Sequence, residues 1–221
     1  MKTIFQNLFL SIKSPKKLFM MLSEKPDFKG AIGIIILMGI LHGLVAILFD
    51  QKFAETFHLS DRPIIWIILY PFVMGLLLFI GIGLGSVIET LWVQLCFKFL
   101  RVKVRFLTIL SVIIYSLIPL FLREIVSMAW PDILVKVGGI PKFSYYKTSL
   151  APFAESYLES YPNLFHLFSK VELFTIWSIA LSVIGISIIG KISYKKSLLI
   201  KVLSLLISFF AIILYDHVKH A

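Results

Sequence analysis

Five stretches of the chain are almost continuously apolar over 17 to 28 residues, and this pattern limits the possible folds more than any other feature of the sequence. They run from about 30 to 49, 64 to 91, 106 to 126, 173 to 189 and 197 to 214. A hydrocarbon core about 30 Å thick needs helices of about 20 apolar residues, because backbone polar groups in lipid must be satisfied within their own segment. The pattern predicts an all-α integral membrane protein, a bundle of five transmembrane helices.

Little of the chain is left for a separate soluble domain. Hydrophobic residues make up 59% of the sequence and charged residues 15%, against about 45–50% and about 25% in soluble domains. We expect a cytoplasmic amphipathic segment at 1–29, the five-span domain at 30–214 and a short tail at 215–221. The net charge of +10 comes from Lys and Arg residues in loops beside the apolar spans, which favours anionic lipid headgroups at the cytoplasmic face as partners over nucleic acid.

The distribution of these basic residues predicts the orientation. With a cytoplasmic N-terminus, thirteen Lys and Arg residues lie on the cytoplasmic side, six before residue 30, four at 98–105 and three at 191–196, and seven lie on the other side. The positive-inside rule therefore places the N-terminus in the cytoplasm and, after five spans, the C-terminus outside. In a prokaryote this would be the cytoplasmic (inner) membrane.

Two regions outside the spans carry amphipathic patterns. Between residues 4 and 12, apolar residues recur at helical spacing, which predicts an in-plane interfacial helix. Ser14 followed by Pro15 predicts the start of a second helix, with Leu18, Phe19, Met21 and Leu22 on its apolar side. The alternative is a disordered tail. The 127–172 loop predicts amphipathic helices on the outer leaflet, with a lid over the bundle as the alternative.

Ionisable residues at membrane depth are the strongest functional candidates, because each costs about 2.5–3.5 kcal/mol near the bilayer centre on insertion scales. Glu89 is placed toward the cytoplasmic end of the second span, and Arg123 and Glu124 near the outer end of the third. We expect Arg123 to pair with Glu172 or Asp50, and the boundary residue Glu172 to reach water.

Two further features concern the helix backbones. Pro119 predicts a kink in the third span, where the hydroxyl of Tyr115 could help to satisfy the freed backbone groups. The Gly81-x-x-x-Gly85 spacing predicts close helix packing. A nucleotide-binding loop is the alternative for these glycines, but no strand precedes them.

Catalytic patterns are missing from the sequence. No nucleophile with a base, and no cluster of carboxylates and histidines on facing spans, can be identified. His217 and His220 supply two ligands where a structural zinc site usually has four. We therefore predict no enzymatic activity, no metal and no cofactor.

Several motifs together resemble the Yip family, the Ypt/Rab-interacting membrane proteins and their prokaryotic relatives. They are Ser14-Pro15-x-x-x-Phe19, Thr108-Ile-Leu-Ser111-x-x-x-Tyr115-Ser116-x-x-Pro119, and Phe174-x-x-Trp177 followed by Gly185. The resemblance implies a five-span fold in a membrane. Eukaryotic members carry a large hydrophilic N-terminal region and associate with Rab-type GTPases, whereas the short segment here resembles the prokaryotic branch, so a Rab-type GTPase is a doubtful partner.

The functional prediction is a non-enzymatic membrane scaffold or interaction protein. The alternative is a small transporter or permease subunit with a polar path through Glu89, Tyr115 and Arg123. The candidates for function or packing are Glu89, Tyr115, Pro119, Arg123, Glu124, Trp177, Gly81 and Gly85.

Overall fold

The computed structural model describes residues 2–49, 64–123, 126 and 172–220. Its helices are α1 (Lys2–Lys13), α2 (Pro15–Glu24), α3 (Phe28–Phe49), α5 (Ile64–Phe99), α6 (Phe106–Ser116), α9 (Leu173–Gly190) and α10 (Tyr194–His220). The predicted helices of the loop up to residue 171, together with Asp50 and Glu124, lie outside the described residues.

A helix is present at each of the five predicted spans. Among the described residues, three segments are long and apolar enough to cross a membrane, Ile80–Phe99, Phe106–Arg123 and Leu173–Gly190, and α3 adds the shorter apolar stretch Phe28–Leu41. These helices support an integral membrane protein, and the count of five stays a prediction. The second span is predicted to end near residue 91, and the helix that contains it, α5, continues to Phe99.

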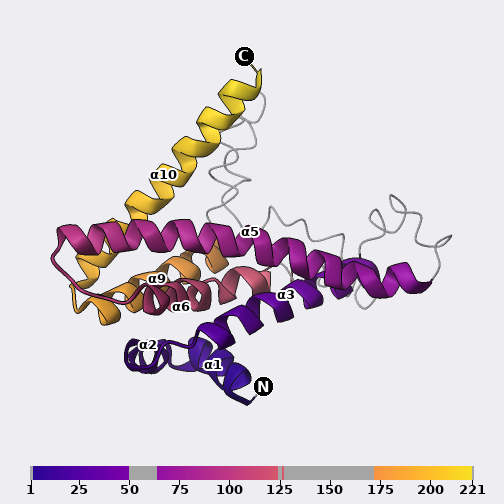
Figure 1. The fold of residues 1–221 in the computed structure, drawn as a ribbon, viewed down its shortest axis with the longest axis horizontal. Helices are drawn as coiled ribbons and strands as arrows, with labels where there is room; N and C mark the ends of the chain where they lie inside the picture. The colour runs from indigo at the N-terminus through magenta and orange to yellow at the C-terminus, as the bar shows by residue number, and fades with distance from the viewer. Residues whose placement is uncertain (1, 50–63, 124–125, 127–171, 221) are drawn as a thin grey trace.

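The helices form a bundle around α5, the longest of them (Figure 1). α3 runs along one part of α5, while α6 and α9 pack together beside another part. α1 and α2 lie across α6, α9 and the start of α3. α10 contacts α9 and α5 near its beginning and then diverges from the bundle (Figure 1).

One glycine allows three helices to meet in the core. A Cβ added at Gly185 in α9 would lie 2.4 Å from Cγ1 of Val112 in α6 and 3.3 Å from the ring of Phe19 in α2. Phe19 and Val112 are both fully buried. The absence of a side chain at Gly185 thus brings together residues from three of the motifs noted in the sequence.

Gly81 and Gly85 make no such close approach. Among the described residues, no atom lies within 4 Å of a Cβ built at either position. Both glycines are on an exposed side of α5, near the exposed side chains of Leu77 and Leu84. The predicted packing partner for this face is therefore not supplied by the described part of the chain.

The two N-terminal helices form as predicted, but α1 buries polar residues beside the partly buried Leu8 and Leu10 and leaves part of its apolar pattern exposed. Asn7 and Ser11 are buried, whereas Phe9 is 60% and Ile12 51% exposed. Where the surroundings are lipid, outward apolar side chains are already in a favourable medium, and polar groups gain by finding partners inside the bundle.

The second helix buries most of the predicted set. Leu18, Phe19 and Leu22 are buried, while Met21 is 42% exposed. Ser14 stands at the N-cap position with Pro15 in the first turn, but the Ser14 side chain makes no capping hydrogen bond. The sequence signal thus identified the helix start correctly without the capping bond that usually accompanies it.

Pro119 interrupts the third span as predicted. α6 ends at Ser116, and a second helical piece covers 118–123. Proline lacks the N–H that would continue the helical ladder. The carbonyl of Ser116 instead accepts a hydrogen bond of 2.8 Å from Oγ of Ser178 in α9. The hydroxyl of Tyr115 does not take this role and points to another cluster.

Candidate functional site: polar contacts between the helices

Asn7, Asp27 and Tyr115 form a buried hydrogen-bonded cluster that joins α1, the start of α3 and α6. The Tyr115 hydroxyl donates to Oδ2 of Asp27 at 2.8 Å, and Nδ2 of Asn7 is 2.7 Å from the same oxygen and 2.9 Å from the Tyr115 hydroxyl oxygen. Tyr115 is 0% and Asn7 3% exposed. The cluster therefore fixes the N-terminal helix to the bundle.

Asp27 has a second role at the beginning of α3. Its Oδ1 accepts a hydrogen bond of 2.9 Å from the backbone N–H of Gly30, and its carbonyl accepts one of 3.0 Å from Ala31. A Cβ at Gly30 would lie only 2.0 Å from Oδ2 of Asp27, so glycine is required there. Sequence reasoning missed Asp27, although Pro-Asp before an apolar run is a recognisable helix-start signal.

Glu89 in α5 is paired with Lys201 in α10. Nζ of Lys201 donates to Oε1 of Glu89, and the two side chains are only 7% (Lys201) and 16% (Glu89) exposed. Glu89 lies nearer the C-terminal than the N-terminal end of α5, and its position toward the cytoplasmic side of the membrane stays a prediction. Nearby, the Trp92 indole N–H donates to the carbonyl of Ile200 at 3.2 Å.

A hollow of about 800 Å³ lies beside this ion pair. Its polar lining comes from Ser86, Glu89 and Ser204, and the rest of the wall is mainly apolar. Ser86 is 2% exposed, and its Oγ has no hydrogen-bond partner. Ser86 and Glu89 thus border a hollow of ligand size.

Arg123 and Glu172 form the third contact. Nη1 of Arg123 is 2.6 Å from Oε1 of Glu172, which confirms one of the two predicted pairings. Glu172 is only 2% exposed, so the expectation that it reaches water was wrong. It directly precedes α9, and its carbonyl accepts the N–H of Ile176 at 2.9 Å.

The three predicted members of the polar path thus have different partners. Glu89 binds Lys201, Tyr115 binds Asn7 and Asp27, and Arg123 binds Glu172. Trp177 is partly buried and packs against the hydrophobic core. Within the described ranges, no three His, Cys, Asp or Glu side chains come together in a way that could hold a metal ion.

Comparison with known proteins identifies the family. No curated protein and no solved structure matches the chain. The model of the Yip1 domain, however, matches residues 9–215. This match runs from α1 into α10 and includes the Glu89–Lys201 and Arg123–Glu172 pairs as well as Asp27 and Tyr115, so the chain belongs to the Yip family of membrane proteins.

Proposed function

We propose that this protein is a non-enzymatic membrane scaffold that binds an acidic partner protein through the exposed side of α1 and α2. The observation that carries the proposal is the buried cluster of Asn7, Asp27 and Tyr115, which fastens α1 to the bundle. Together with the buried Leu18 and Phe19 of α2, it holds the N-terminal helices in one orientation. A surface held in this way is preorganised, which lowers the entropic cost of binding.

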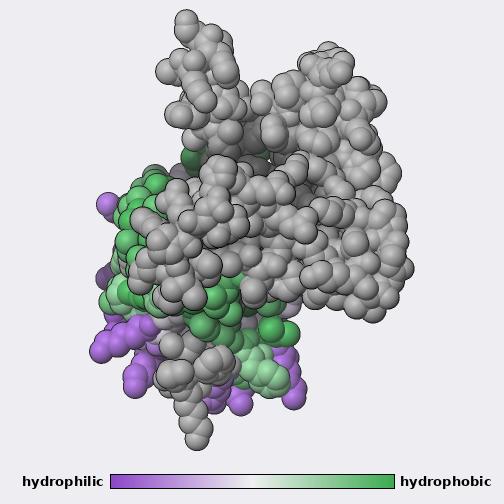
Figure 2. Space-filling model, turned by 90° about the vertical axis from the view of Figure 1, so that its right-hand side faces the viewer, coloured by the Kyte–Doolittle hydropathy of each residue, from purple (hydrophilic) through white to green (hydrophobic). Residues whose placement is uncertain are grey.

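The chemistry of the exposed side suits a partner with acidic and apolar groups. Lys13, Lys16 and Lys17 are exposed, and Met20 beside them is 52% exposed. Nζ of Lys13 lies 5.4 Å from the ring centroid of Phe9. Figure 2 shows hydrophilic residues gathered at the lower edge of the molecule, the edge at which Figure 1 places α1 and α2, below a band of hydrophobic residues.

The polar contacts inside the bundle support a scaffold better than a transporter. A transport path needs ionisable side chains that face a common route. Here each candidate side chain makes a contact between helices, and the three contacts have no residue in common. The transport alternative therefore lacks the continuous polar lining on which it depends.

The test is affinity purification from the native host in a mild detergent after chemical crosslinking. One variant carries Lys13→Glu, Lys16→Glu and Lys17→Glu, and its control carries Lys191→Glu, Lys195→Glu and Lys196→Glu, the same change in charge on other exposed residues. We expect reproducible partner proteins with the wild type and the control, and their loss with the N-terminal variant. Equal recovery from all three would refute this surface.

Deletion of residues 1–29 is not an adequate test, because Leu18, Phe19 and Leu22 belong to the hydrophobic core. A parallel purification of Glu89→Gln addresses the transport alternative. If the protein is recovered with a bound small molecule and no partner, and this molecule is lost on Glu89→Gln, the scaffold proposal is wrong.

A further inference from the structure

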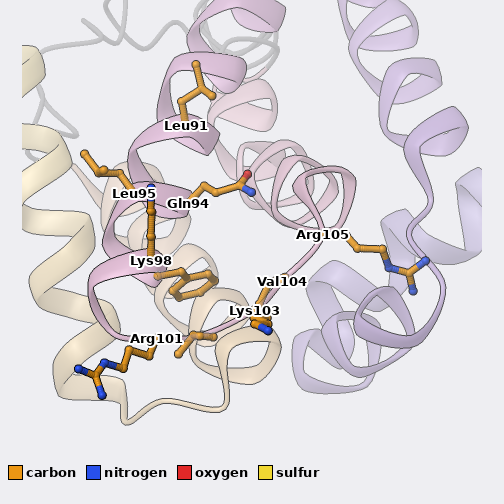
Figure 3. Close-up of a pocket in the computed structure, with 10 residues that line it drawn as sticks. Leu91, Gln94, Leu95, Lys98, Arg101, Lys103, Val104 and Arg105 are labelled. Carbon is orange, nitrogen blue, oxygen red and sulfur yellow. The ribbon is translucent and has the colours of Figure 1, made fainter.

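The connection between α5 and α6 borders a hollow of about 810 Å³ whose rim is strongly basic (Figure 3). Its lining consists of Leu91, Gln94, Leu95, Phe97, Lys98, Arg101, Val102, Lys103, Val104 and Arg105. Four of these residues are basic and none is acidic. None of the four takes part in an ion pair within the described part of the chain.

In the segment that connects α5 to α6, partly buried valines alternate with exposed basic residues. Val102 and Val104 are partly buried and pack against the core, while Arg101, Lys103 and Arg105 are exposed. Such alternation is the property of extended backbone, in which successive side chains point to opposite sides. The two valines thus hold the connection in place with its positive charges outward.

Arg101 occupies a backbone conformation that normally favours glycine. Its φ is 57°, and the hydrogen bonds from Val102 N to Phe97 O (2.8 Å) and from Arg101 N to Lys98 O (3.1 Å) close the end of α5. This is the Schellman arrangement, where the left-handed residue is usually Gly. An arginine is unfavourable here for the local backbone, and strain of this kind is often found at functional positions.

A basic residue at position 105 is also unfavourable for the stability of α6. It immediately precedes α6 and makes no side-chain capping hydrogen bond. The N-terminus of a helix carries partial positive charge and N–H groups without intrahelical acceptors, so a basic residue is disfavoured and an anion favoured. By contrast, Lys98 in the last turn of α5 complements the helix dipole.

An exposed apolar stripe on α5 leads directly to this rim. Leu84, Ile88, Leu91 and Leu95 are 61%, 68%, 56% and 45% exposed, and their spacing of four, three and four residues continues by three to Lys98. From residue 84 to residue 98 the helix rises about 21 Å at about 1.5 Å per residue. This exceeds half of a hydrocarbon core about 30 Å thick, so the stripe is long enough to accompany an acyl chain through one leaflet.

We propose that the hollow between α5 and α6 binds an anionic phospholipid, with its phosphate among Lys98, Arg101, Lys103 and Arg105 and one acyl chain along the stripe. The basic side chains fan out around the rim, with Arg105 pointing away from Lys98 (Figure 3). To bind one phosphate, these long and flexible side chains turn inward toward the hollow. Free phosphate would satisfy the charges, but only a lipid uses both the charges and the stripe.

The test is native mass spectrometry of the full chain in detergent with added phosphatidylglycerol or phosphatidylcholine. Lys98→Gln with Lys103→Gln removes two charges from the rim, and Lys195→Gln with Lys196→Gln removes two exposed charges that do not line the hollow. We expect the rim variant to lose affinity for phosphatidylglycerol by about fivefold per charge, the factor that matches roughly 1 kcal/mol for each basic side chain near an anionic surface. The control should retain wild-type affinity.

Arg101→Gly separates a loss of lipid affinity from misfolding, because glycine is favoured at this φ and the variant should fold. It should keep or raise the thermal stability while lowering the affinity for phosphatidylglycerol. Unchanged affinity in the rim variant, an equal loss in the control, or equal binding of phosphatidylcholine would each overturn the proposal. Displacement of the lipid by millimolar inorganic phosphate would show a site for free anions and overturn the assignment to a lipid.

Discussion

At the scale of single residues, the Tyr115 hydroxyl is the group that most directly couples α1 to the bundle. Tyr115→Phe would leave Nδ2 of Asn7 and Oδ2 of Asp27 with one partner fewer at a buried position. We expect the free energy of unfolding to fall by about 1–3 kcal/mol. Denaturant unfolding in detergent measures this, with Tyr194→Phe as the control because Tyr194 is 48% exposed. An equal effect of both substitutions would contradict the role of the cluster.

The Glu89–Lys201 pair leads to a second prediction at this scale. Glu89→Gln leaves the ammonium of Lys201, which is 6% exposed, without its counter-charge. Removal of one partner from a buried pair costs about 3–5 kcal/mol, whereas replacement of both by apolar residues is often neutral. We expect Glu89→Gln to destabilise the protein and the added change Lys201→Met to restore stability. If Lys201→Met does not restore stability in a double-mutant cycle, the Glu89–Lys201 pair does not hold α5 and α10 together.

The residue contacts differ in how far the sequence could predict them. Arg123 and Glu172 were paired correctly because both lie at the same predicted end of neighbouring spans. Lys201 was not assigned to Glu89, since that pairing depends on how deep α10 sits against α5. The sequence did not identify Asn7 as buried, because helical periodicity does not distinguish a polar face turned to water from one turned to a buried partner.

At the scale of the helices, Gly185 leads to a prediction about packing. In Gly185→Ala the new methyl group would overlap Cγ1 of Val112, a branched side chain with little freedom to move. We expect a loss of about 1–3 kcal/mol in unfolding free energy. Gly81→Ala is the matched control, since space is open there and alanine favours helix formation. A stable Gly185→Ala protein would show that α6 and α9 can separate without cost.

The helix boundaries were largely predictable, whereas the buried faces were not. Apolar runs and the Ser14-Pro15 signal located the helices that form, including α2 from Pro15 to Glu24. The burial of Asn7 and Ser11 in α1 and the open face of Gly81 and Gly85 could not be predicted. In lipid both faces of a helix can be apolar, so hydrophobicity alone does not identify the face that packs.

At the scale of the whole molecule, the unusual element is α10. It carries Lys195, Lys196 and Lys201 in its first eight residues, and it diverges from the bundle (Figure 1). The predicted placement of the C-terminus outside depends on α10 crossing the membrane. Glu89 lies within the candidate span Ile80–Phe99, and its pair with Lys201 holds the beginning of α10 against α5.

Thiol labelling decides whether α10 crosses. In a background with Cys96→Ala, which removes the single native thiol, Lys103→Cys, Lys195→Cys and Lys219→Cys are treated in intact cells with a membrane-impermeant maleimide. We expect labelling only at position 219, because five spans put the two ends of α10 on opposite sides and the positive-inside rule keeps positions 103 and 195 in the cytoplasm. If positions 195 and 219 label alike, α10 does not cross, and its charged start then marks an interfacial helix held to α5 by Glu89. If positions 103 and 195 label and 219 does not, the five spans stand with the opposite orientation, and the basic rim of the α5–α6 hollow would face the outer leaflet.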